Sequence, residues 1–423
     1  MNYSFNAPLF DAVVSATKND VVRFHMPGHS GVGSGTSFFA SAKYDFTEIS
    51  GLDNLLSPTG VIADAERLAA EAYGCDDALI YSQGATTCMH TAVLCVRDKG
   101  RAVCVGDMHK SFWHAAMLYN LEVLNCDISN LNNALAAGGV GSVFITSPNY
   151  LGKTQNLKYI RQLCNKYGVA TVIDAAHGAH FPFSKLLPEN PNKYCDIAIF
   201  SQHKTMCAYG GGAMLCVSGA FSDFARVNRQ LIHSTSPSYL VMSSVDYSRA
   251  MWSERGEKIY SFISECVEKF KSVIPKGYSV YDNDDISRLV VSCGGDAVCV
   301  AKGLEEKGVY CEAAIGDKLV FILTPYNCSY LTYLAGALKG ITPKKPKQTP
   351  IFNLNKVCCS GKVTTVKIDE CEGKIACMPI GLYPPGTPLI FAGEVIDGDA
   401  AMFIKENRDK LFGLASGKVV VLE

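Results

Sequence analysis

The 423-residue chain predicts an α/β fold, with a large domain on a mainly parallel sheet and a smaller C-terminal α/β domain. Between residues 46 and 240, short apolar strands alternate with helical patterns such as LKYIRQLCNKYG, an order typical of parallel sheets. A long amphipathic stretch over residues 241–275 predicts a helix that connects the two domains. In residues 276–423, apolar runs such as RLVVSC and KLVFILT predict the strands of the smaller domain.

Two further segments complete the expected organisation. Residues 1–45, rich in glycine and aromatic residues, predict an irregular N-terminal arm. The run KGITPKKPKQTP at residues 339–350 is basic and proline-rich, which is typical of a linker or an exposed, solvated loop. A chain of this length is expected to divide into more than one domain.

The composition agrees with that of a water-soluble protein. A formal net charge of -1 indicates neither a nucleic-acid-binding nor an anionic-membrane-binding surface. No apolar run is long enough to span a membrane, and the first ten residues lack the pattern of a signal peptide, so we expect a cytoplasmic protein. The 18 cysteines lie mostly in apolar segments without a CxxC pair, which predicts reduced core thiols and no metal site.

Two reactive groups follow neighbouring apolar strands. Asp174 ends the strand in TVIDAAHGAH, and Lys204 lies in SQHKT, directly after the strand CDIAIFS. A lysine that loses its proton near neutral pH and a buried carboxylate that keeps a pyridine nitrogen protonated are the two groups that pyridoxal phosphate (PLP) requires. Taken singly, Asp174 could cap a helix and Lys204 could be a solvated loop residue. Together they predict a PLP site.

Two more strand ends strengthen this prediction. The small-residue turn at Gly84, Ala85 and Thr86 precedes a helix and offers N–H groups to a phosphate, although an ordinary strand-to-helix turn needs the same residues. His109 follows the strand AVCVG, and its flat ring could stack on a pyridine ring. Since ligands of open α/β sheets bind at the carboxyl ends of the strands, these residues are expected to converge.

Nine motifs occur along the chain in this order: FHMPGHSG, DFTEISGLDNLLSPTGVIADAE, GATT, MHKS, SPNYLG, DAAHGAHF, SQHKT, TSPSYLVMSSVD and YPPGTPLIFAGE. Through these motifs the chain resembles the Orn/Lys/Arg decarboxylases, bacterial basic amino-acid decarboxylases of the aspartate-aminotransferase-like PLP fold, in which they occur in the same order. The resemblance begins at the PGH motif, so we expect a short form without the N-terminal wing domain of the large inducible enzymes.

The resemblance implies a role for each matching residue. Lys204 becomes the Schiff-base lysine and Asp174 the partner of the pyridine nitrogen, with Ala176 below the ring and His109 above it. His177 is placed beside the ring hydroxyl or the substrate carboxylate. The phosphate is held by Gly84, Ala85, Thr86, Ser201 and His203, and by Ser236 from a neighbouring subunit. The resemblance thus implies a homodimer or larger homo-oligomer with shared sites.

The substrate is less sharply defined. A basic amino acid needs a carboxylate for its distal cation, and Glu48 and Asp53 are the candidates, although both could be capping or turn residues. The chain departs from the family at Ala175 and in the run Tyr209–Gly212. We therefore expect decarboxylation of lysine, ornithine or arginine. The alternatives are a PLP lyase or aminotransferase acting on another amino acid, and a non-catalytic regulator that retains the fold.

Overall fold

The computed structural model describes residues 5–17, 23–27, 29–31, 37, 40–345 and 362–422. The helices of this part are α1 (Pro8–Ala16), α2 (Val61–Tyr73), α3 (Ala85–Val96), α4 (Lys110–Leu118), α5 (Leu131–Ala136), α6 (Leu157–Tyr167), α7 (Gln202–Thr205), α8 (Gly219–Ile232), α9 (Tyr239–Val273), α10 (Ala297–Glu305), α11 (Leu331–Leu338) and α12 (Gly398–Asn407). None of these described helices is long and apolar enough to cross a membrane.

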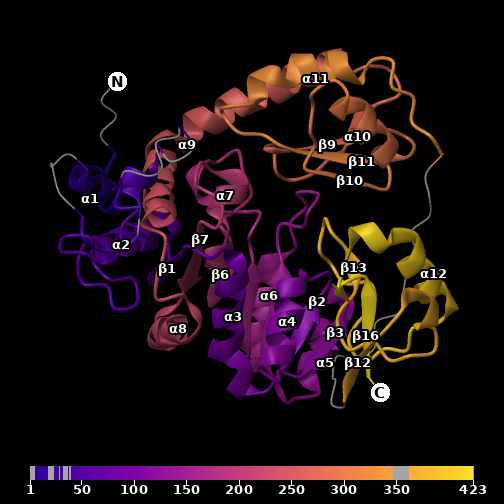
Figure 1. The fold of residues 1–423 in the computed structure, drawn as a ribbon, viewed down its shortest axis with the longest axis horizontal. Helices are drawn as coiled ribbons and strands as arrows, with labels where there is room; N and C mark the ends of the chain where they lie inside the picture. Colours follow the sequence, from indigo (N-terminus) through magenta and orange to yellow (C-terminus); the bar gives the residue numbers. More distant parts are fainter. Residues whose placement is uncertain are drawn as a thin grey trace.

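The largest sheet has seven strands in the order β1-β7-β6-β5-β4-β2-β3 (Figure 1). Its strands are β1 (Asp77–Tyr81), β2 (Arg101–Val105), β3 (Val123–Cys126), β4 (Val140–Thr146), β5 (Ala170–Asp174), β6 (Ile197–Phe200) and β7 (Ala213–Val217). The pairs from β3 to β6 are parallel, whereas β7 runs antiparallel to both of its neighbours. The prediction of a mainly parallel sheet is therefore confirmed.

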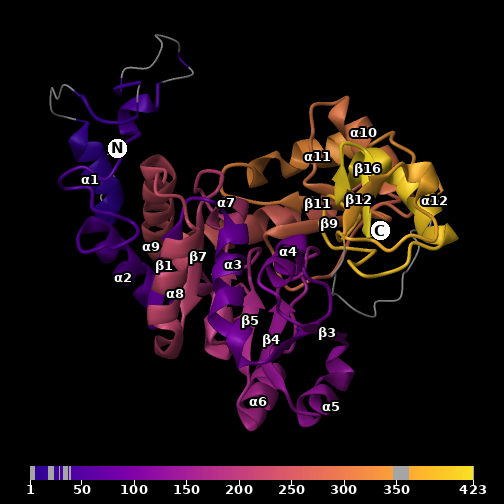
Figure 2. The same cartoon turned by 60° about the horizontal axis from the view of Figure 1, so that its bottom comes forward.

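Alternate residues of this sheet enter two separate cores. On β4, Val143 and Ile145 pack with residues of α5, α6 and α9, whereas Phe144 packs with residues of α3, α4 and α8. Burial on both faces is the reason that the strands are continuous apolar runs without polar alternation. Figure 2 shows α3, α4 and α8 on one side of the sheet. Polar residues are thereby concentrated at the strand ends.

The N-terminal arm differs from the expectation of irregular structure, because residues 8–16 form helix α1. Pro8 at the first helical turn favours a helix start, and Leu9 and Val13, one turn apart, are buried in a shared core with α2 and α9. The carboxylate of Asp246 on α9 accepts hydrogen bonds from the N–H groups of Leu9 and Phe10 at 3.0 and 3.4 Å. The arm is thus anchored to the long helix of its own chain.

Helix α9 runs from the large sheet to a second, four-stranded sheet (Figure 1). That sheet is antiparallel in the order β10-β11-β9-β8 and consists of β8 (Ser279–Val280), β9 (Arg288–Ser292), β10 (Ala313–Ile315) and β11 (Lys318–Ile322). It lies across from the carboxyl ends of the parallel strands of the large sheet (Figure 1). Helix α9, Tyr239–Val273, thus overlaps the stretch 241–275, whose role as a connection between two domains stays a prediction.

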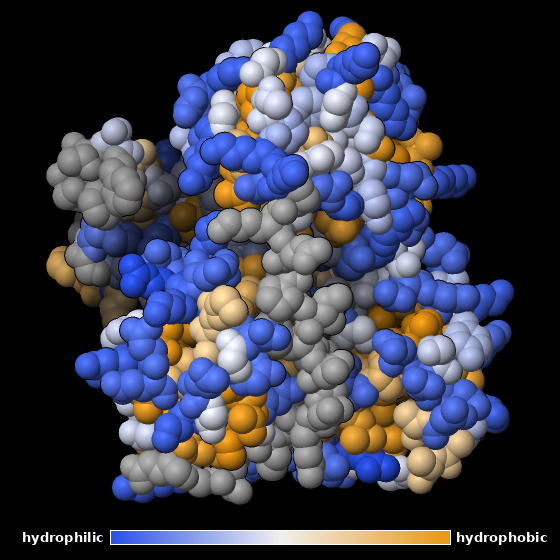
Figure 3. Space-filling view, turned by 90° about the vertical axis from the view of Figure 1, so that its right-hand side faces the viewer, coloured by the Kyte–Doolittle hydropathy of each residue, from blue (hydrophilic) through white to orange (hydrophobic). Residues whose placement is uncertain are grey.

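The last part of the chain adds small sheets with a core of their own. Its strands are β12 (Val363–Val366), β13 (Gly381–Leu382), β14 (Leu411–Phe412), β15 (Leu414–Ala415) and β16 (Lys418–Leu422). The region 276–423, predicted as one small domain, therefore contains several separate sheets. The predicted domain boundaries stay a prediction. Figure 3 shows this side of the molecule, where hydrophilic residues surround small apolar patches. Residues 346–350 of the predicted linker lie outside the described residues.

Candidate active site

Five chain segments meet at the carboxyl ends of the large sheet. They follow β1, β2, β4, β5 and β6, and each carries polar residues at the end of its strand or within a few residues of it. In an open α/β sheet this edge is the usual ligand-binding position. All 16 described cysteines are free, and the described residues contain no cluster of His, Cys, Asp and Glu that could hold a metal ion.

Asp174 is the last residue of β5, and its side chain is almost completely buried. One carboxylate oxygen, Oδ1, accepts a hydrogen bond from the N–H of Ala176 at 3.1 Å. Burial raises the pKa of Asp174, while the charge of Lys204 acts in the opposite direction. A buried carboxylate of this kind needs a cationic partner, and Lys204 is the charged group that acts on it.

Lys204 lies in the single turn of α7, and its Nζ is 3.3 Å from Nε2 of His177. Burial lowers the pKa of Lys204, and the charge of Arg288 lowers it further, against the opposing effects of Asp174 and Glu312. A lowered pKa increases the fraction of uncharged amine near neutral pH. Lys204 is therefore suited to act as a nucleophile.

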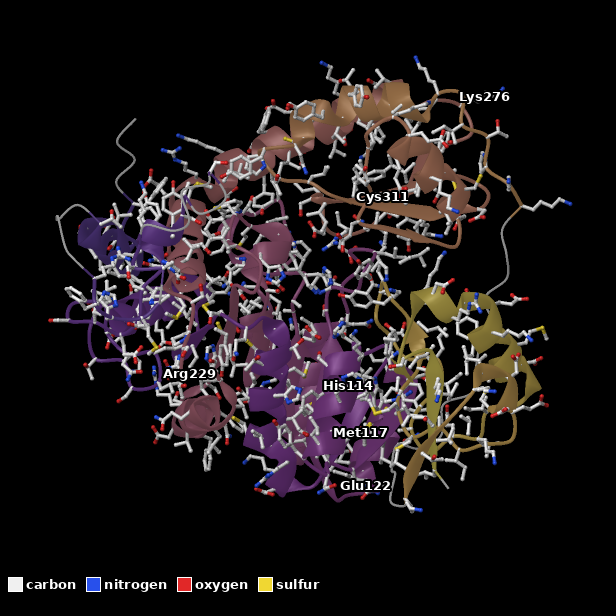
Figure 4. All side chains as sticks on the ribbon, viewed as in Figure 1. His114, Met117, Glu122, Arg229, Lys276 and Cys311 are labelled. Carbon is white, nitrogen blue, oxygen red and sulfur yellow. The ribbon has the colours of Figure 1, made fainter. Side chains whose placement is uncertain are left out.

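His109 precedes helix α4 and caps it, because its Nδ1 accepts a hydrogen bond from the N–H of Ser111 at 3.2 Å. Burial, followed by the charges of Lys204 and Lys110, lowers the pKa of His109 to about 3. The ring is therefore neutral and presents an uncharged flat surface. His114, one turn further along α4 (Figure 4), takes no part in this cap.

Gly386 of the C-terminal segment lies against His109. A Cβ at Gly386 would come within 2.9 Å of the His109 ring, and its φ of +88° favours glycine as well. The carbonyl of Gly386 also accepts a hydrogen bond from the N–H of Lys110 at 2.8 Å. The C-terminal part of the chain thus covers one side of the site, which is consistent with YPPGTP being one of the predicted motifs.

The turn before α3 has the form of an anion cradle. Gly84 occupies the N-cap position with φ of +84°, no side chain covers the first N–H groups, and the space around its Cα is open. The N–H of Gly84 donates to the carbonyl of Gly211 at 2.7 Å, and Nδ1 of His203 lies 3.1 Å from the carbonyl of Gly212. Ser201 Oγ is 3.1 Å from the same nitrogen of His203.

These contacts explain the glycine at position 211 in the run Tyr209–Gly212. A Cβ at Gly211 would lie 2.8 Å from the backbone oxygen of Ser82, and its φ is +92°. Only glycine allows the two backbones to approach this closely without strain. The run therefore connects two parts of the predicted phosphate site, because Gly211 bonds to Gly84 and Gly212 contacts His203.

Ser236 is exposed and lies in a turn that is bonded to the same region of its own chain. The N–H of Ser234 donates to Oε1 of Gln83 at 3.0 Å, and the N–H of Ser238 donates to Oγ of Ser82 at 3.2 Å. The segment TSPSY is therefore held next to the predicted phosphate turn, with Ser236 facing outward. Contact with a neighbouring subunit stays a prediction.

The two predicted substrate carboxylates lie elsewhere. Asp53 has φ of +65°, and its carboxylate accepts hydrogen bonds from the N–H groups of Thr59, Gly60 and Ile62 at 2.7 to 3.2 Å, just before α2. This is the capping role that the sequence left open for Asp53. Glu48 is exposed beside Tyr239, outside the group of strand-end residues.

Sequence reasoning missed three residues of the site. Arg288, the buried first residue of β9, donates from Nη2 to Nδ1 of His177 at 2.8 Å. The Tyr150 ring stands edge-on to His177 with centroids 5.0 Å apart, and its hydroxyl donates to Oε1 of Glu312 at 2.5 Å. Figure 4 labels Cys311, which lies next to Glu312 and just before β10 of the second sheet. An arginine that opens the apolar run RLVVSC was an available signal, whereas nothing in the sequence distinguishes Glu312.

Comparisons with known proteins identify a matching family. A family model described as "Orn/Lys/Arg decarboxylase, major domain" matches residues 7–124 and 122–286, and "Orn/Lys/Arg decarboxylase, C-terminal domain" matches residues 343–408. The chain is 27% identical to uncharacterized protein YaaO of Bacillus subtilis (strain 168), over 98% of this chain and 96% of that protein. It is 26% identical to an arginine decarboxylase of Halalkalibacterium halodurans, over 96% and 94% of the two chains.

Among solved structures, the lysine decarboxylase LdcF of Francisella novicida matches with a TM-score of 0.79 and 17% identity. The match covers 98% of this chain and 80% of that one. At this identity the likeness shows a shared fold. The predicted fold class, an aspartate-aminotransferase-like PLP fold with a mainly parallel large sheet, is therefore confirmed.

Proposed function

Because the chain belongs to the Orn/Lys/Arg decarboxylase family, we propose that it removes the α-carboxylate of lysine, ornithine or arginine with PLP as cofactor. The products are carbon dioxide and the corresponding amine. Family membership supports amino-acid decarboxylation. The choice of a basic substrate draws further support from the arginine decarboxylase relative, at 26% identity.

The observation that carries this proposal is the buried group formed by Lys204, His177 and Asp174. A lysine with a lowered pKa lies within the field of a buried carboxylate, at the edge of the sheet where ligands bind. The residues present fit PLP. The turn at Gly84 has open space and uncovered N–H groups that suit a phosphate, and Lys204 is the cation whose charge acts on the buried carboxylate of Asp174. When bound, PLP supplies a ring that accepts the electron pair released as carbon dioxide leaves.

Each side chain has a defined task in this proposal. With PLP bound, Lys204 would hold the cofactor through its amine, and the carboxylate of Asp174 would keep a proton on the pyridine nitrogen. The neutral ring of His109 would support one face of the cofactor and Ala176 the other. His177 would lie beside the ring hydroxyl or the substrate carboxylate. Gly84, Ala85, Thr86, Ser201 and His203 would hold the phosphate.

The distal cation of a basic substrate needs a carboxylate partner. Asp53 is engaged by backbone N–H groups, so Glu48 is the remaining sequence-based candidate, reaching the site of a neighbouring subunit from its exposed position. Within the same chain, Glu312 is a second carboxylate, besides Asp174, whose charge acts on Lys204, and the hydroxyl of Tyr150 donates a hydrogen bond to it. We propose that at least one of Glu48 and Glu312 contacts the distal cation.

The direct test of the site is reduction with borohydride. Purified full-length chain incubated with PLP should be yellow, and after reduction the peptide that contains Lys204 should carry the pyridoxyl group. The variant Lys204→Ala should lose this modification. Among the described lysines, Lys110 directly follows the strand-end residue His109, and its Nζ lies over the rings of Tyr383 and Phe412. Modification of Lys110, or retention of bound cofactor after reduction in Lys204→Ala, would contradict the assignment.

A further inference from the structure

The turn that follows β5 is clamped by the second sheet at two histidines. His177 Nδ1 accepts from Arg288 at 2.8 Å, and His180 Nε2 lies 3.1 Å from the carboxylate of Asp285. Asp285 and Arg288 belong to one short segment, NDDISR, that enters β9. All four side chains are buried. The contact between the two sheets is therefore made at the same turn that carries Asp174.

The bond from Arg288 determines which ring nitrogen of His177 carries the proton. A guanidinium has only donors and stays charged in proteins, so Nδ1 of His177 must be the acceptor and cannot carry a hydrogen. Burial and the charges of Lys204 and Arg288 lower the pKa of His177 well below its usual value, which keeps the ring neutral. A neutral imidazole without a proton on Nδ1 has its proton on Nε2.

That proton points to the reactive lysine. Nε2 of His177 and Nζ of Lys204 are 3.3 Å apart. An uncharged amine has a lone pair that can accept this hydrogen bond, whereas an ammonium group has none and would bring two donors together. We propose that Arg288 is a positioning residue, which holds the proton of His177 on Nε2 and thereby stabilises the uncharged amine of Lys204. This inference rests on the proposed role of Lys204 in the function above.

Other charged groups face the same pair from every side. Asp174 and Glu312 raise the pKa of Lys204, and Arg288 lowers it by its charge alone, in addition to the hydrogen-bond effect. His109 and His180 also act on His177. The carboxylate of Asp285 compensates the buried charge of Arg288, while Nη1 of Arg288 is buried without a hydrogen-bond partner. A charge effect and a proton-placement effect must therefore be separated by experiment.

The reactivity of Lys204 can be measured without cofactor or substrate. Full-length chain freed of PLP is treated with formaldehyde and a borohydride reagent, and methylation of Lys204 is quantified by peptide mass spectrometry across a range of pH. Only the uncharged amine reacts. In Arg288→Gln, the amide oxygen can accept from Nδ1–H of His177, which frees Nε2 to accept from the lysine ammonium.

We expect methylation in Arg288→Gln to be about fivefold slower than in the parent chain at about pH 7, a factor that corresponds to one ordinary hydrogen bond. The variant should react more slowly because loss of the bond raises the pKa of Lys204, which leaves less uncharged amine at any pH below that pKa. At alkaline pH the amine is uncharged in both chains, so the two methylation rates should become equal. Arg288→Lys, which keeps a charge and a donor, should restore the profile. A lower plateau at alkaline pH would instead indicate a damaged site and would count against the proposal.

Two comparisons make the test decisive. Lys153→Gln removes an ion pair with Asp284, at 3.3 Å, which also links the turn after β4 to the segment before β9. This pair does not touch His177, so the dependence of Lys204 methylation on pH should match that of the parent chain. In a His177→Gln background, Arg288→Gln should shift the profile less than it does in the parent. Equal shifts in both backgrounds would show that Arg288 acts by charge alone. Because methylation needs no PLP, absence of decarboxylase activity would leave this result unaffected.

Discussion

Replacement of Gly211 by alanine should weaken PLP binding without unfolding the chain. The added Cβ would lie 2.8 Å from the backbone oxygen of Ser82, and the φ of +92° is unfavourable for any other residue. The backbone conformation costs about 1–2 kcal/mol, and overpacking against a backbone atom adds about 1–3 kcal/mol. Since a domain is stable by about 5–15 kcal/mol, most molecules should stay folded.

The strain acts directly on the predicted phosphate turn. The carbonyl of Gly211 accepts the hydrogen bond from Gly84 at 2.7 Å, so relief of the contact with Ser82 moves Gly84 as well. A loss of about 1.4 kcal/mol at this turn corresponds to tenfold weaker binding. We therefore expect at least about tenfold weaker PLP binding, measured by absorbance titration, together with a lower melting temperature.

The neighbouring Gly210 offers a matched control. A Cβ at Gly210 meets nothing within 4 Å, and its φ is not in the positive range, so Gly210→Ala should bind PLP and melt like the parent chain. If Gly211→Ala binds PLP as tightly as Gly210→Ala, the reasoning that joins this glycine run to the phosphate turn is refuted.

The remaining predictions concern the chemistry, the assembly and the substrate. Asp174→Asn keeps the shape but not the charge, so PLP should still bind while turnover falls by orders of magnitude; near-normal turnover would mean that another group holds the ring proton. If sites are shared, inactive Lys204→Ala chains mixed with an inactive Ser236 or Glu48 variant should regain activity in heterodimers, and no recovery after verified subunit exchange would overturn shared sites. Glu312→Gln should raise KM for basic substrates by about tenfold or more, and an unchanged KM would exclude Glu312 as the partner of the distal cation.

The residues predicted from the sequence are those that depend on local pattern. Asp174 ends an apolar strand, whereas Lys204 and His109 follow apolar strands, and parallel strands necessarily bring such positions to one edge of the sheet. The structure places them together for that reason. The fold class was predictable on the same basis, because alternating strands and helices specify a parallel sheet.

The residues that were missed depend on packing between distant segments. Arg288 reaches His177 only because the second sheet docks on the turn after β5, and no local pattern encodes that contact. Asp53, by contrast, was a candidate from the sequence that the structure places in a capping role. A carboxylate before a helix can either cap the helix or bind a ligand, and the choice depends on the course of the loop to Gly60. The helix in the predicted irregular arm likewise depends on Asp246, far along the chain.

The central claim, PLP-dependent decarboxylation of a basic amino acid, is tested most directly by the products. Full-length chain loaded with PLP is incubated separately with lysine, ornithine, arginine and neutral amino acids, and carbon dioxide and amine are quantified, with Lys204→Ala as the inactive control. The account predicts equal amounts of carbon dioxide and the corresponding amine from at least one basic amino acid, and none from the control. Formation of an oxo acid without carbon dioxide would indicate an aminotransferase, and no product from any amino acid would indicate a non-catalytic protein; either result would contradict the account.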